Sequence, residues 1–204
     1  MWQGKILHMH TTPKGGAPMV AHDSITMIPG VGIEGDRYAL GTGKYSQIPD
    51  VREVTLIEVE TLEALKRDHD IDLSVDDHRR NLTTRDVPLN HLVGKTFWVG
   101  DVQLRGGRLN TPCRYLDLLL GKKVCDLLEH RSGLNCSIVS GGTLNVGAAV
   151  HLLASRIARP DAMPAPRSCH QRQKRWTGQR LRVPAALHLA QHPARIRGLA
   201  LGIR

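Results

Sequence analysis

The stretch Thr96-Phe-Trp-Val-Gly-Asp-Val-Gln-Leu104 carries the clearest folding signal in the sequence. Two β-prone runs, residues 96–99 and 102–104, flank a Gly-Asp dipeptide. Two such runs separated by two turn-forming residues are typical of a β-hairpin. The sequence therefore predicts an antiparallel strand pair near the middle of the chain.

Strand-like patterns continue on both sides of this hairpin. Strands are expected over residues 4–11, 53–57, 135–139 and 148–153, and a short apolar run covers residues 25–28. The strands over 135–139 and 148–153 are expected to pair with each other around Ser140-Gly-Gly-Thr143. Many short strands with few helices are typical of a β-rich α+β domain, here a barrel.

The helical patterns are fewer and shorter. An amphipathic helix is expected over residues 58–68, with Leu62 and Leu65 on one face. Two more short helices are expected over residues 114–120 and 124–130, separated by Gly121.

The positive charge lies at the C-terminal end of the chain. The net charge is +9, and residues 156–204 hold eleven of the 28 basic residues but one of the 19 acidic residues. The domain is therefore expected over residues 1–154, followed by a basic Arg/Pro/Ala-rich tail over 155–204. Such composition favours disorder. Other interpretations of the tail are an arm contacting nucleic acid, a short docking helix, or out-of-frame translated sequence.

The four cysteines do not form a disulfide framework. Cys113, Cys125, Cys136 and Cys169 are widely spaced, without a C-x-x-C pair. The N-terminus lacks an apolar signal core, and no run approaches the roughly 18 apolar residues of a membrane span. A cytoplasmic protein with reduced thiols and no membrane association is expected.

Two glycine-rich matches lack the context that nucleotide binding requires. Gly30-Val-Gly-Ile-Glu-Gly35 fits G-x-G-x-x-G, but Pro29 precedes it and no good helix pattern follows. Gly43-Lys44 is followed by Tyr45, where a P-loop needs Ser or Thr. Neither stretch is interpreted as a nucleotide site.

Cys113 is the strongest candidate for chemistry. Pro112 holds the preceding residue extended, and a helical pattern begins at Arg114, so the sulfur is expected at a helix N-terminus. The helix dipole and the neighbouring Arg would favour the thiolate. A thiolate can attack sulfur, carry a persulfide or bind a soft metal. The alternative is a buried structural cysteine, an interpretation that fits Cys125 and Cys136 well.

Three polar groups accompany Cys113 in the sequence. The first is His78-Arg-Arg-Asn-Leu-Thr-Thr84, the second is His130-Arg-Ser-Gly-Leu134, and the third is Gly35-Asp-Arg-Tyr38. Arginine forks suit phosphate and other oxyanions. Each group taken alone also fits a solvated polar turn.

The order of these segments resembles the MOSC domain family, named for the C-terminal part of molybdenum cofactor sulfurase. The resemblance covers about residues 4–153. It rests on the following segments: Glu34-Gly-Asp-Arg-Tyr-Ala39, Arg52-Glu-Val-Thr-Leu-Ile-Glu58, Arg79-Arg-Asn-Leu82, Leu92-Val-Gly-Lys95, Pro112-Cys113, Arg131-Ser-Gly-Leu134 and Gly141-Gly142.

The resemblance implies a MOSC-type β-barrel with a few short helices, and an association with molybdenum cofactor or sulfur transfer. The family's signature cysteine falls on Cys113, as molybdenum ligand or sulfur carrier. The anionic end of the cofactor would then pair with Arg79, Arg80 and Arg131. Its pterin would hydrogen-bond Asn81 and Thr83.

Three functions follow from this interpretation. The leading one is cofactor binding, or sulfur carriage for the cofactor, through Cys113. The chain has no pyridoxal phosphate domain, so sulfur would come from a partner, a pyridoxal-phosphate-dependent cysteine desulfurase. The second is a molybdenum-dependent reductase of N-hydroxylated compounds with a separate electron-transfer protein. The third is a non-enzymatic module whose basic tail contacts nucleic acid. The rest of the chain gives this little support, because residues 1–155 hold 17 basic and 18 acidic residues and are close to neutral.

One departure from the family pattern lies at Gly147. Ala148 follows it where the family usually has an acidic residue, and the chain continues for about fifty residues beyond the expected last strand. Both features are consistent with an altered C-terminus.

Overall fold

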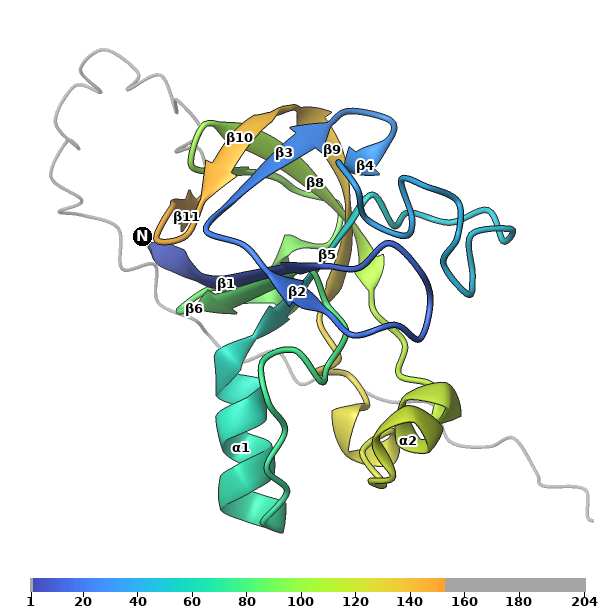
Figure 1. Ribbon diagram of the computed structural model, residues 1–204. Helices are drawn as coiled ribbons and strands as arrows, with labels where there is room; N and C mark the ends of the chain where they lie inside the picture. Colours follow the sequence, from blue (N-terminus) through green and yellow to red (C-terminus); the bar gives the residue numbers. More distant parts are fainter. Residues whose placement is uncertain (1, 153–204) are drawn as a thin grey trace, which may run out of the picture. The chain divides into compact units, whose positions relative to one another are not determined.

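Seven strands close into a barrel in the computed structural model, which describes residues 2–152 (Figure 1). They are β1 (Gly4–Thr11), β5 (Val54–Glu58), β6 (Leu82–Arg85), β7 (Thr96–Val99), β8 (Val102–Leu109), β9 (Leu134–Ser140) and β11 (Ala149–His151). Their order is β11-β7-β8-β9-β5-β6-β1, and β1 pairs with β11 to close the ring, with Gly4 opposite Val150. The predicted β-rich α+β fold with a barrel is confirmed.

The predicted hairpin forms the β7–β8 pair. Val99 lies opposite Val102, and Phe97 lies opposite Leu104. All four side chains are fully buried in the barrel core. This core is largely aliphatic, as the low aromatic content implies, and Phe97 is its largest fully buried side chain.

The expected pairing of the last two strands is wrong. β9 pairs with β5 and β8, whereas β11 lies between β7 and β1. The segment expected to be their turn contains a further strand, β10 (Gly142–Asn145), which joins β3 (Ser24–Ile28) and β4 (Gly32–Ile33) in a separate three-stranded sheet. The pattern of β10 was weak because Leu144 is its one buried side chain.

One pair in the barrel is parallel. β5 runs parallel to β6, and the connection between them includes α1 (Val59–His69). Leu62 and Leu65 of α1 are buried, as predicted, in a second apolar cluster that also contains Leu116 of α2 (Arg114–Leu120). The two helices lie at the same end of the barrel (Figure 1). The short strand β2 (Val20–Ala21) pairs with the far end of β1.

The helix expected over residues 124–130 is wrong. That segment contains a single 3₁₀ turn, η2 (Asp126–Leu128), and another such turn, η1 (Leu89–Leu92), precedes β7. Asp117 of α2 accepts hydrogen bonds from the backbone N–H groups of Val124 and Cys125, each at 2.8 Å. Glu129 then takes an extended conformation, so a regular helix cannot continue through it.

No helix within residues 2–152 is long and apolar enough to cross a membrane. The predictions for the basic tail, residues 155–204, fall outside the described residues.

Candidate functional site

A pocket of about 280 Å³ lies beside Cys113, where the end of β8 meets the loops before β5, β6 and α2. It is lined by Arg37, Tyr38, Tyr45, Arg52, Thr55, Arg79, Arg80, Arg108, Asn110, Thr111, Pro112, Cys113, Leu116 and Asn135. The volume is near the lower end of about 300–1,000 Å³ found for ligand pockets. Five arginines and no carboxylate line it among the described residues.

Cys113 occupies the N-cap of α2 in an extended conformation, as predicted from Pro112. Its side chain is half-buried, and the Tyr45 hydroxyl donates a hydrogen bond to its sulfur at 3.4 Å. This bond to Cys113, together with burial, raises the pKa of Tyr45 to about 12. The sulfur is therefore held at the pocket wall by a hydroxyl that stays protonated at neutral pH.

The cation beside the sulfur is not the one expected from the sequence. Arg114, next to Cys113 in the chain, is exposed and pairs with Asp126 at 3.1 Å. Arg80 lies close enough to Cys113 for their charges to interact. Guanidinium groups that are distant in sequence, Arg80 among them, therefore line the pocket with the sulfur.

Arg80 is a half-buried cation held by neutral acceptors. Its Nε donates to the Ser132 carbonyl at 2.9 Å, its Nη2 to the Ser132 hydroxyl at 2.6 Å and its Nη1 to the His78 carbonyl at 3.1 Å. Burial and the nearby Arg37 lower the pKa of Arg80 to about 10. The side chain stays charged at neutral pH, and the described residues give it no carboxylate partner.

Arg79 presents a second available cation. Its backbone has a φ of 64°, a left-handed conformation that is uncommon for a residue with a Cβ and is often associated with functional sites. Its guanidinium is half-buried and has no hydrogen-bond or ion-pair partner within residues 2–152. Burial, followed by Arg37, lowers the pKa of Arg79.

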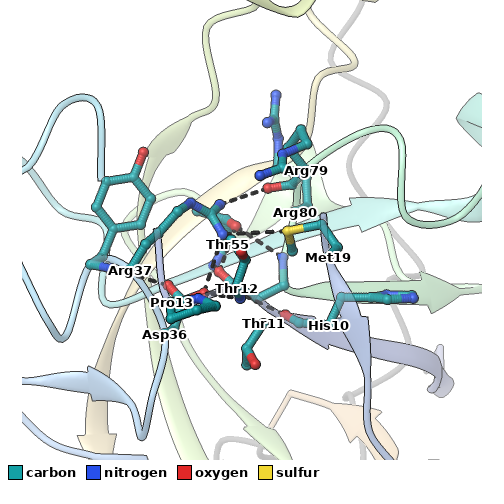
Figure 2. Close-up of polar contacts among 12 residues, drawn as sticks. His10, Thr11, Thr12, Pro13, Met19, Asp36, Arg37, Thr55, Arg79 and Arg80 are labelled. Atoms are coloured by element: carbon teal, nitrogen blue, oxygen red, sulfur yellow. Dashed lines mark hydrogen bonds and ion pairs between the residues drawn. The ribbon is translucent and has the colours of Figure 1, made fainter. Parts of the chain in front are cut away.

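Arg37 connects this turn to the barrel. Its Nη2 donates to the Arg79 carbonyl at 2.9 Å, and its Nη1 contacts Asp36 at 3.2 Å and the Met19 sulfur at 3.5 Å (Figure 2). The carboxylate of Asp36, which does not line the pocket, therefore neutralises the charge of Arg37. The remaining positive charge of Arg79 and Arg80 faces the pocket.

Two predicted ligands of the pterin lie beneath the pocket, outside its lining. Asn81 is fully buried. Its side-chain carbonyl accepts hydrogen bonds from the N–H and hydroxyl groups of Thr55, and its side-chain NH₂ group donates to the Asp36 carboxylate and to the His10 backbone carbonyl. Thr83 is also fully buried, with its hydroxyl 3.1 Å from Nε2 of His78. Both side chains support the turn that carries the arginines.

Arg131 lies outside the pocket. Its Nε donates to the Leu127 carbonyl at 2.7 Å, and its own carbonyl accepts from Thr61 of α1. The segment around it does reach the site, but through Ser132, which holds Arg80.

Several lining residues were not predicted as ligands. Tyr45, Arg52 and Arg108 come from loop and strand positions with no local motif of their own. Two signals were available: Arg52 begins a segment that resembles the MOSC pattern, and Arg108 lies five residues before Cys113.

The donor set suits an anion that also carries a soft centre. Guanidinium groups bind phosphate and other oxyanions, and a thiolate binds soft metals or sulfur. Within residues 2–152, no group of three or more His, Cys, Asp or Glu could hold a metal ion by itself. A metal here would need ligands of its own in addition to Cys113.

Arg79→Gln is expected to weaken binding of inorganic phosphate by at least about tenfold, because one charge-assisted hydrogen bond contributes about 1.5–3 kcal/mol. The melting temperature should change little, since the guanidinium has no partner to lose. Calorimetric titration and thermal melting would measure both effects. Unchanged phosphate affinity would show that Arg79 does not face the bound anion.

Several solved structures share the fold of this chain. Among solved structures, the chain is similar to the YuaD protein of Bacillus subtilis (14% identity, 74% of this chain and 97% of that chain, TM-score 0.62). It is also similar to YiiM of Geobacillus stearothermophilus (12%, 74% and 75%, TM-score 0.58) and to YiiM of Escherichia coli (16%, 74% and 70%, TM-score 0.55). These likenesses show a shared fold.

A search of curated proteins gave no match. The family model of the MOSC domain matches residues 43–151, more than half of the chain, and this range includes Cys113 and the Arg79-Arg80 turn. The chain belongs to the MOSC domain family.

Proposed function

We propose that this protein binds molybdenum cofactor in the arginine-lined pocket, with Cys113 as the residue that ligates the metal or carries sulfur for it. The observation that carries the proposal is the placement of one accessible sulfur and two cations without carboxylate partners in the same pocket. The cofactor has a phosphate and soft sulfur around its metal, so both parts of the donor set have a matching group.

Each pocket residue has a distinct task in this proposal. Arg79 and Arg80 bind the anionic end, and the fixed contacts of Arg80 to Ser132 reduce the reorganisation that binding requires. Tyr45 orients the sulfur of Cys113 through its hydroxyl. When bound, the cofactor supplies a redox-active metal centre.

Sulfur carriage needs a donor persulfide on a separate cysteine desulfurase. The Cys113 thiolate attacks the outer sulfur of that persulfide, the donor S–S bond breaks, and the donor cysteine leaves as a thiolate. A persulfide then remains on Cys113, with no net oxidation or reduction. Arg80 lines the same pocket and would provide positive charge near this sulfur.

The test is the molybdenum content of protein produced in a host that makes the cofactor. Wild-type protein should contain the metal, Cys113→Ser should lose most of it, and Cys125→Ser should match the wild type because Cys125 does not line the pocket. Equal molybdenum contents in wild type and Cys113→Ser would show that Cys113 is not a ligand of the metal.

Intact-mass analysis separates the two tasks of Cys113. After incubation with a cysteine desulfurase and cysteine, a carrier gains the mass of one sulfur atom, and Cys113→Ser does not. Metal that depends on Cys113 without this gain supports the ligand task. If the wild-type protein acquires neither metal nor sulfur, the proposed function is refuted.

A further inference from the structure

We propose that Arg52 and Arg108 form a second anion subsite at the edge of the pocket, where the carboxylate of Asp50 binds both arginines until an anionic group of the ligand displaces it. The pocket would then take a ligand with two anionic groups, one at Arg79 and Arg80 and the other at Arg52 and Arg108. The natural ligand of this subsite depends on the proposed function, but the subsite itself can be tested without it.

Asp50 binds both arginines at once. Arg108 donates to its two carboxylate oxygens through Nε, at 2.9 Å, and through Nη2, while Nη2 of Arg52 lies 2.8 Å from Oδ2. The hydrogen bond from Arg108 lowers the pKa of Asp50, so the carboxylate is ionised at neutral pH. This bidentate geometry is the one that guanidinium groups use for phosphate and carboxylate ligands.

The position of the three residues makes Asp50 the displaceable partner. Arg52 and Arg108 line the pocket, whereas Asp50 lines an adjoining hollow that shares Arg52 with it. Asp50 belongs to the loop that joins β4 to β5, and Arg108 belongs to strand β8. A loop carboxylate can move away from a strand arginine with less disturbance than the reverse.

The two pairs of arginines therefore differ in their readiness to bind. Arg79 has no hydrogen-bond or ion-pair partner within residues 2–152, so an anion can bind it directly. Arg52 and Arg108 are engaged by a carboxylate with geometry suited to an anion. The first pair would capture the ligand, and the second would bind it once Asp50 gives way.

Displacement of Asp50 would also affect Cys113. Nη1 of Arg52 donates to the carbonyls of Tyr45, at 2.5 Å, and of Ile48, at 3.1 Å, and the Tyr45 hydroxyl contacts the Cys113 sulfur. The loop that carries Asp50 is thus fastened at one end to the arginine pair and at the other to the sulfur. Occupation of the second subsite would therefore reach Cys113 through Arg52 and Tyr45.

The experiment is calorimetric titration of the full chain with inorganic pyrophosphate at low salt. Asp50→Asn should bind pyrophosphate about tenfold more tightly than wild type, because a competing charge next to two cations is removed. The matched control is Glu63→Gln, which removes the same charge from an arginine-paired carboxylate outside this pocket. Its affinity should equal that of wild type.

Adding Arg108→Gln to Asp50→Asn should cancel the gain. Unchanged or weaker binding by folded Asp50→Asn would overturn the proposal, and so would a gain that survives the loss of Arg108. If Asp50→Asn fails to fold, Arg108→Gln alone decides: it should bind pyrophosphate about tenfold more weakly than wild type. Unchanged binding would then overturn the proposal.

This outcome is independent of the metal analysis. Pyrophosphate contains neither molybdenum nor sulfur. If Asp50→Asn binds pyrophosphate more tightly but the protein never acquires metal, the subsite is supported and the proposal of cofactor binding is refuted. If metal binds through Cys113 but Asp50→Asn does not change the affinity for pyrophosphate, cofactor binding is supported and the proposal of a second subsite is refuted.

Discussion

Asn81→Leu is expected to lower the free energy of unfolding by about 4 kcal/mol, the largest effect of any polar substitution considered for the site. Leucine fills a similar volume but leaves the Thr55 N–H, the Asp36 carboxylate and the His10 carbonyl each without one buried partner. Each such loss costs about 1–3 kcal/mol. The substitution should also disturb Arg37, because Asp36 binds both residues.

Denaturant unfolding followed by circular dichroism measures this effect. The matched control is Asn90→Leu, where the exposed amide donates one hydrogen bond, to the His130 carbonyl, and a change of about 1 kcal/mol or less is expected. Similar losses for both variants would mean that the buried contacts of Asn81 contribute no more than a surface hydrogen bond.

Gly133→Ala is expected to destabilise the protein by at least about 3 kcal/mol. Gly133 has a φ of 100°, and an added Cβ would lie 1.9 Å from the Leu56 carbonyl oxygen in β5. The backbone must shift to relieve this contact. Because Ser132 precedes Gly133 and holds Arg80, the shift should also weaken phosphate binding.

Gly94→Ala isolates the two causes. Gly94 also has a positive φ, of 75°, but an added Cβ would meet no atom within 4 Å. Its cost should therefore be that of the backbone conformation, about 1 kcal/mol. Thermal melts and phosphate titrations of both variants give the comparison. Equal stability of the two variants would show that the Leu56 contact is easily relieved.

Local patterns were sufficient for the elements whose signal lies within their own residues. The β7–β8 hairpin, β1 and α1 each follow from the spacing of apolar residues and from the turn residues beside them. The position of Cys113 at the start of α2 likewise follows from Pro112 and the pattern after it. The partners of β1, by contrast, are distant in sequence, because it pairs with β6 and β11.

Features that depend on distant contacts were not predictable in the same way. β11 pairs with β7 and β1 because of the closure of the ring, which no pattern within residues 148–153 encodes. In the segment over residues 124–130, the N–H groups of Val124 and Cys125 donate to Asp117 of α2, and the helical conformation ends at Glu129. In both places a tertiary contact overrode the local preference.

The candidate site shows the same division. The turn with Arg79 and Arg80 was found from its composition, and both side chains line the pocket. Arg131 was chosen from a segment that reaches the site through Ser132, its neighbour, because composition cannot show which residue of a turn faces a cavity. Arg52 and Arg108 gather around Asp50 only once the barrel is formed.

Because β1 pairs with β11, the barrel can close only after nearly the whole domain has been synthesised. During synthesis β1 emerges long before its partner β11, because Gly4 pairs with Val150. Until then, one edge of β1 stays open and can pair with the edge of another nascent chain. Slow translation or high expression would therefore be expected to cause aggregation through β1, and holding the edge closed with a chaperone would raise the yield of folded protein.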